Sequence, residues 1–187
     1  MADLRELRKF EKLGPFEIKN ELIGLAKESS RRSQSALLNA GRGNPNWVAT
    51  EPREGFFLLG QFAITESKRV MELSPGIGGM PQSKGIGARL ERWLEKHSDM
   101  PGAAFLQSMV RFAVAKFSFG IDAFVHELVD SIIGDNYPVP DRMLVHNEQI
   151  VHEYLMWAMC GDPRPKGKFQ LYAVEGGTAA MCYIFKS

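Results

Sequence analysis

The chain has 187 residues, of which 44% are hydrophobic and 24% charged, and this composition excludes a mainly disordered chain, a coiled coil and a collagen-like repeat. The 23 Lys and Arg residues nearly balance the 22 Asp and Glu residues, so the net charge of +1 gives no electrostatic reason to expect nucleic acid or an anionic membrane as a partner. Because the charged N-terminus lacks an apolar signal core and no apolar run is long enough to cross a membrane, the expected location is the cytoplasm.

Residues 1–50 are expected to form an N-terminal arm that ends in a loop. Apolar residues spaced by three from Leu4 to Leu13 predict a short amphipathic helix. Pro15 suits the first turn of a second helix, and both helices are candidates for packing on another subunit. Residues 39–47 contain two glycines and three asparagines, which favour a loop with unusual backbone angles.

Residues 51–160 are expected to form a helical region. Apolar periodicity predicts four further stretches of helix after a first helix that runs from Thr50, a suitable N-cap, to about Met71. The four stretches are Ile86–Leu94, Pro101–Phe117, Ile121–Ile133 with Gly134 as its C′ residue, and about Met143 to Met159. Between the first two helices, residues 74–87 hold five glycines and two prolines, so they are expected to be a loop and are a candidate lid.

Residues 161–187 are expected to contain a turn, one strand and the start of a helix. Phe169–Val174 is the one strong strand candidate, and Ala179–Phe185 has the pattern of the first turns of a helix. A single strand cannot satisfy its own backbone groups. The pattern is therefore typical of the start of an α/β unit whose next strand lies in a longer chain.

The turn Gly176-Gly177-Thr178 between this strand and helix is a candidate anion site. Glycines let the backbone approach a phosphate closely, and the free N–H groups at a helix N-terminus point toward it. The threonine hydroxyl can add a donor. The turn matches neither GxxxxGK[ST] nor GxGxxG, so a plain strand-to-helix turn is an equally good explanation of these residues taken alone.

Two segments taken together resemble one protein family. Residues 39–47 resemble the G-x-G-x-P-x-aromatic loop of the fold-type I pyridoxal-phosphate-dependent aminotransferases, and residues 171–180 resemble their strand and phosphate cradle. Together with Arg53-Glu54 and residues 56–62, the amino-acid sequence of these segments is similar to that of the aspartate 4-decarboxylases, which are also aspartate aminotransferases. The resemblance covers nearly the whole chain and roughly the N-terminal third of that family's length.

The resemblance implies a cofactor, a substrate and roles for individual residues. The cofactor would be pyridoxal 5′-phosphate, with Gly177 and Thr178 offering backbone N–H groups to its phosphate and Gly176 standing where many relatives have serine. Gly43 matches the glycine that meets the α-carboxylate of the substrate, L-aspartate, and Tyr137 resembles the tyrosine that reaches the phosphate in a neighbouring subunit's site. The full enzyme would be an α/β-fold homo-oligomer.

The residues that perform the family's chemistry have no match in this chain. The Schiff-base lysine of the family lies well beyond the cradle, whereas Lys186 follows it too closely, and Lys166 and Lys168 precede it. The expectation is therefore the N-terminal part of a decarboxylase that converts L-aspartate to L-alanine and CO2, inactive by itself. The alternative is a non-catalytic helical assembly module derived from the same family.

No metal site is expected. On the helix predicted from about Met143, Glu148 and His152 can share a face, but His146 cannot join them. Cys160 and Cys182 lack zinc-ligand spacing, so two buried, reduced thiols are expected, with a single disulfide as the alternative.

Overall fold

A computed structural model gives the structure of the chain and describes residues 10–33, 48–71, 73, 78–134, 142–161, 165–167 and 169–186. The chain divides into two compact units, Met1–Val48 and Ala49–Ser187. The domain boundaries expected at residues 50 and 160 stay predictions.

The described part of the first unit is a short 3₁₀ helix η1 (Phe10–Lys12) followed by the helix α2 (Pro15–Ser33). Pro15 opens α2 as predicted, and the backbone N–H of Gly14 donates to the Glu17 carboxylate at 2.8 Å. None of the described side chains of α2 is buried, so this helix has no core of its own. The first predicted helix, Leu4–Leu13, lies mostly outside the described residues.

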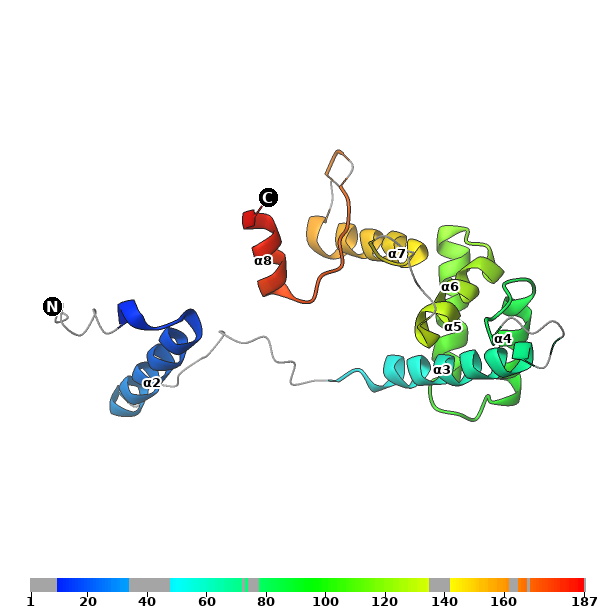
Figure 1. Ribbon diagram of the computed structural model, residues 1–187, viewed down its shortest axis with the longest axis horizontal. Helices are drawn as coiled ribbons and strands as arrows, with labels where there is room; N and C mark the ends of the chain where they lie inside the picture. Colours follow the sequence, from blue (N-terminus) through cyan, green and yellow to red (C-terminus); the bar gives the residue numbers. More distant parts are fainter. Residues whose placement is uncertain are drawn as a thin grey trace. The chain divides into compact units, whose positions relative to one another are not determined.

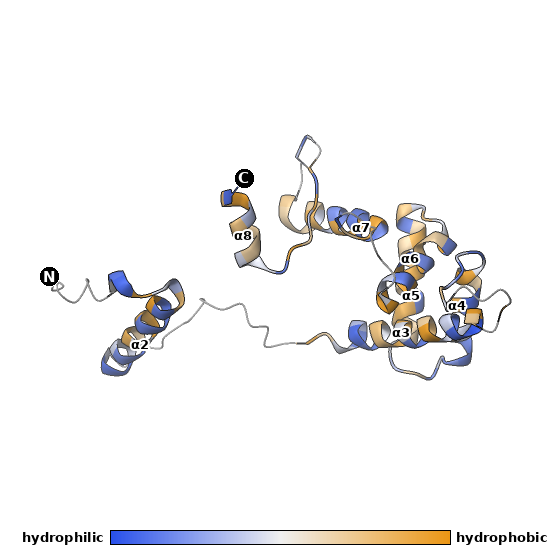
Figure 2. Ribbon diagram, viewed as in Figure 1, coloured by the Kyte–Doolittle hydropathy of each residue, from blue (hydrophilic) through white to orange (hydrophobic). Residues whose placement is uncertain are grey.

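The second unit is built on four packed helices: α3 (Thr50–Met71), α4 (Ile86–Lys96), α5 (Ala103–Phe117) and α6 (Ile121–Ile133) (Figure 1). All four helix predictions are confirmed, and Gly134 ends α6 in the left-handed conformation at a φ of 84°. Figure 2 shows apolar and polar residues alternating around these helices, as expected for helices with one buried face. The apolar faces meet in one core whose most buried side chains include those of Phe62, Ile86, Leu90, Leu106, Phe124 and Val125.

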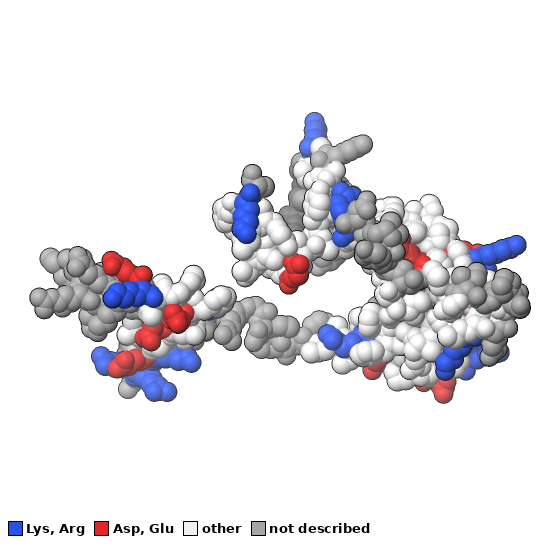
Figure 3. Space-filling model, viewed as in Figure 1, with Lys and Arg blue, Asp and Glu red and all other residues white. Residues whose placement is uncertain are grey.

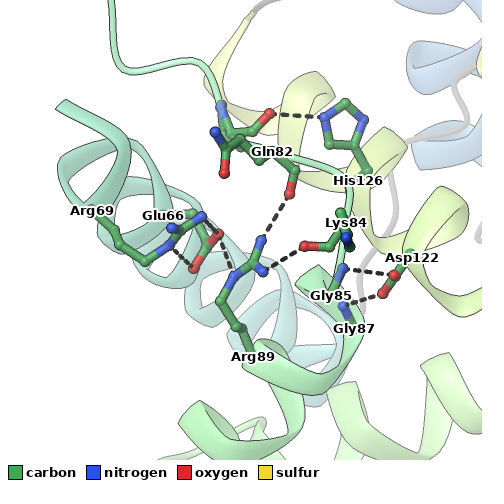
Figure 4. Close-up of polar contacts among 10 residues, drawn as sticks. Glu66, Arg69, Gln82, Lys84, Gly85, Gly87, Arg89, Asp122 and His126 are labelled. Atoms are coloured by element: carbon green, nitrogen blue, oxygen red, sulfur yellow. Dashed lines mark hydrogen bonds and ion pairs between the residues drawn. The ribbon is translucent and has the colours of Figure 1, made fainter. Parts of the chain in front are cut away.

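The segment before α4 is held in place by side chains from two helices (Figure 4). Arg89 on α4 donates at 2.7 to 2.8 Å to two backbone carbonyl oxygens, and a ring nitrogen of His126 on α6 lies 3.0 Å from a third. The three carbonyl groups belong to Lys84, Gln82 and Pro81 respectively. Opening of a lid here would have to break these contacts, so they argue against a lid at residues 81–85.

Asp122 at the start of α6 caps the N-terminus of α4. Gly85, the N-cap residue of α4, has no side chain to accept a hydrogen bond. The Asp122 carboxylate takes that role, accepting the backbone N–H groups of Gly85 at 2.7 Å and Gly87 at 2.9 Å. These two hydrogen bonds hold the pKa of Asp122 below its ordinary value, because they favour the charged carboxylate.

We expect Asp122→Asn to lower the free energy of unfolding by about 1–2 kcal/mol near neutral pH, since the amide loses the charge and keeps only one of the two acceptor oxygens. A lowered folded pKa stabilises the protein above the unfolded pKa of about 3.9, and this contribution is lost as the pH falls through the folded pKa. Thermal melts measure both effects. The difference in melting temperature between wild type and variant should shrink from neutral pH to about pH 3. An unchanged difference would contradict the capping role.

The next helix, expected from about Met143 to Met159, is present as α7 (Val145–Leu155) and continues into a π-helical turn, η2 (Met156–Cys160). It packs on α5 and is tied to α6 by Glu127. The Glu127 carboxylate accepts the backbone N–H of His146 at 3.0 Å and lies 2.6 Å from the Nδ1 atom of the same residue. This contact fixes the N-terminal end of α7 against the core.

The predicted strand Phe169–Val174 is wrong. These residues form neither strand nor helix, and the described part of the chain contains no strand. A strand needs a neighbour for its backbone hydrogen bonds, and no described segment pairs with this one. The helix predicted after the turn is confirmed as α8 (Gly177–Lys186). Cys160 and Cys182 are free thiols, but both are exposed rather than buried as expected.

Candidate functional site

The turn at the start of α8 has the backbone geometry of an anion site. Gly176 has a φ of 153°, a region that side chains disfavour, so glycine suits this position. Its carbonyl accepts the N–H of Ala180 at 3.0 Å, which is the first hydrogen bond of α8. The N–H groups of Gly177, Thr178 and Ala179 therefore have no acceptor within the helix.

The space in front of this turn is open. A side chain added at Gly176 or Gly177 would meet no atom within 4 Å, and all three residues of the cradle are exposed. The positive end of the α8 dipole favours an anion here, whereas the exposed Glu175 just before the turn adds a negative charge. Figure 3 shows α8 itself with mostly uncharged side chains, so the backbone is the main source of positive potential at the turn.

An apolar groove of about 740 Å³ lies beside the turn. One wall is the chain from Tyr172 to Glu175, and the other is a face of α8 with Ala180, Tyr183 and Ile184. The described residues thus fit a phosphate group at the turn, with an apolar surface next to it. Lys186 does not reach the turn, because it stands at the opposite end of α8, about 13 Å along the helix axis.

Two contacts that sequence reasoning missed tie the segment before the turn to α7. The ring of His152 stacks on the ring of Phe169, with centroids 4.3 Å apart and planes 17° apart. The guanidinium carbon of Arg142 lies 5.4 Å from the ring centre of Tyr172. No local pattern could have revealed these pairs, since the two partners of each pair are far apart in the sequence and neither Arg142 nor His152 belongs to a motif.

The other two site residues proposed from the sequence, Gly43 and Tyr137, lie outside the described residues. Their expected roles stay predictions, as does the phosphate-binding role of Gly176–Thr178, the proposed site residues that the structure describes. Within the described ranges, no group of three or more His, Cys, Asp or Glu side chains could hold a metal ion. None of the helices in the described ranges is long and apolar enough to cross a membrane.

Known proteins similar to this chain test the family resemblance indicated by residues 39–47 and 171–180. No protein-family model matches the chain. The chain is 45% identical over 184 residues, or 98% of its length, to a Pseudomonas sp. protein named bifunctional aspartate aminotransferase and L-aspartate beta-decarboxylase. The resemblance is confirmed. The chain spans 34% of the length of that relative, so the aligned region is about a third of the known enzyme.

Proposed function

We propose that these 187 residues form the part of a pyridoxal-phosphate-dependent aspartate 4-decarboxylase and aminotransferase that holds the cofactor phosphate. The observation that carries the proposal is the open glycine turn at the N-terminus of α8, in a chain 45% identical to a protein named bifunctional aspartate aminotransferase and L-aspartate beta-decarboxylase. The reaction of the whole enzyme would be L-aspartate plus a proton to L-alanine plus CO2. The fold-type I α/β architecture belongs to the same proposal.

The residues of this chain would contribute binding and orientation. The N–H groups of Gly177 and Thr178 would hold the phosphate, and the Thr178 hydroxyl would add a donor. Gly43 would leave room for the α-carboxylate of aspartate, and Tyr137 would reach the phosphate of a second subunit in a cytoplasmic homo-oligomer. Bound pyridoxal phosphate supplies an electron sink, which weakens the bond to the carboxylate that leaves as CO2.

Because Lys186, the lysine of α8, stands at the opposite end of that helix, we assign the covalent attachment of the cofactor to residues outside this stretch. The purified 187-residue chain should then release no CO2 from L-aspartate in the presence of pyridoxal phosphate. Release of CO2 by this chain alone would contradict that assignment.

The cradle itself is tested with pyridoxamine 5′-phosphate, which lacks the aldehyde and so cannot react with surface lysines. We expect the chain to bind it weakly and inorganic phosphate to compete. Gly177→Val should weaken binding at least about tenfold, or about 1.4 kcal/mol, because its side chain would fill the space in front of the turn. The substitution is otherwise tolerated, since nothing lies within 4 Å of the added atom and the φ angle is helical.

The matched control is Gly24→Val on α2, another exposed helix glycine with nothing within 4 Å. This variant should bind pyridoxamine phosphate like the wild type. If the wild-type chain binds nothing, the non-catalytic assembly module becomes the better explanation. If Gly177→Val and Gly24→Val bind equally, the ligand does not occupy the turn.

A further inference from the structure

The segment that leads into the phosphate cradle lacks the usual means of staying in place. Residues 169–174 have no strand partner among the described residues, and the side chains of Phe169 and Tyr172 remain 41% and 64% exposed. Backbone hydrogen bonds therefore do not explain the position of this segment. Its contacts with α7 are made by side chains.

The two contacts lie near opposite ends of α7. Arg142 stands three residues before the helix and contacts Tyr172, whereas His152 stands in its last turn and contacts Phe169. The segment and the helix thus run in opposite directions, and two points of attachment fix both the position and the direction of the segment. One contact alone would leave it free to pivot.

Arg142 is itself held in place. Its Nη2 atom donates to the Glu148 carboxylate at 2.6 Å, and both side chains are about two-thirds buried, with exposures of 32% and 28%. The bond to Glu148 and a further one to Tyr172 raise the pKa of the guanidinium above its ordinary value. Glu148 of α7 therefore fixes the Arg142 guanidinium beside the Tyr172 ring. A cation held near an aromatic ring is attracted to the ring.

We propose that Arg142 and His152 are positioning residues that hold the segment before the phosphate cradle against α7 by contacting Tyr172 and Phe169. The inference rests on the proposed function only where it calls the turn a phosphate cradle. The two contacts form a clasp, defined by these four residues, that sets where the turn at Gly176 begins. Neither residue touches the phosphate.

Backbone order parameters from ¹⁵N relaxation of residues 169–174 test the clasp directly in the 187-residue chain. They should fall from about 0.85, the value of a rigid backbone, to below about 0.6 in Arg142→Met and in His152→Ala, since each removes one aromatic contact. His152→Phe keeps a flat ring and should restore the wild-type order parameters, and Arg142→Lys, which keeps a cation, should restore them in part. Gln149→Ala, on an exposed position of α7, is the control and should change nothing.

A general loss of stability would lower the order parameters in α3 to α6 as well, and would not be reversed by the phenylalanine. Unchanged order parameters in Arg142→Met and His152→Ala, or no rescue by His152→Phe, would overturn the clasp. Binding of pyridoxamine phosphate is measured separately on the same variants. Failure of the wild type to bind would contradict the proposed function, while the order parameters still decide whether the clasp exists.

Discussion

Gly102→Ala should lower the free energy of unfolding of the second unit by about 3–5 kcal/mol, enough to unfold a marginal domain. Gly102 is the N-cap residue of α5 and lies where the backbones of α3 and α5 touch. An added side-chain carbon would stand 2.4 Å from the backbone nitrogen of Gly55 and 2.5 Å from the backbone carbon of Glu54. Both are helix backbone atoms, so they cannot rotate away.

Backbone strain adds to this clash. The φ of Gly102 is 83°, where an L-residue with a side chain costs about 1–2 kcal/mol. Gly134 is a matched control because its φ is 84°, yet nothing lies within 4 Å of an added carbon. Gly134→Ala should therefore cost only the backbone strain, about 1 kcal/mol.

Urea unfolding followed by circular dichroism measures the two variants. Most of the difference between them is the cost of separating α3 from α5, since the φ angles are nearly equal; a smaller part is strain, because the ψ of −8° at Gly102 lies further from the left-handed minimum than the ψ of 28° at Gly134. Gly55→Ala should fall between them, because its added carbon would meet the ring of Phe105 at 2.8 Å, and a side chain can move. Equal stabilities of Gly102→Ala and Gly134→Ala would show that the two helices do not approach as closely as described.

Helices of this chain were predictable because their signal is local. The spacing of Leu90 and Leu94, the start at Thr50 and the stop at Gly134 each depend on residues within a few turns. The close approach of Gly55 and Gly102 was not predictable, since it depends on how two helices cross. A glycine in a helix pattern gives no indication of which distant backbone it meets.

The strand prediction failed for a related reason. The pattern from Phe169 to Val174 is a good local match to a strand, but a strand exists only when another segment pairs with it. The turn at Gly176-Gly177-Thr178 was predictable because it is a local signal at a helix start, and α8 begins at Gly177; its role as a phosphate cradle stays a prediction. The contacts of Arg142 and His152 were missed because aromatic and cationic partners far apart in sequence leave no pattern.

Glu66 is the second position at which we expect a large effect. Its side chain is 3% exposed, and both of its oxygens are bonded to arginines: Arg69 at 3.0 and 3.1 Å, and Arg89 at 2.8 Å (Figure 4). Glu66→Gln should lower the free energy of unfolding by about 2–3 kcal/mol, since two partly buried guanidinium groups, with exposures of 34% and 20%, would lose their counter-charge.

The matched control is Glu91→Gln. Glu91 also pairs with an arginine of the same unit, Arg111, but at 3.5 Å and with the two side chains 44% and 62% exposed. Water already screens that pair, so its loss should cost about 0–0.5 kcal/mol. Urea unfolding of both variants decides whether burial, rather than the mere presence of an ion pair, gives Glu66 its effect.

A double-mutant cycle then shows what Glu66 stabilises. The Arg89 guanidinium donates to the backbone carbonyl groups of residues 82 and 84 and to the Glu66 carboxylate. It therefore joins α3 to the segment before α4. The effects of Glu66→Gln and Arg89→Gln on the free energy of unfolding should be coupled by about 1–3 kcal/mol, because Arg89 is poorly oriented once Glu66 is replaced. Purely additive effects would mean that Arg89 holds the segment without help from Glu66, and that α3 and the segment are stabilised independently.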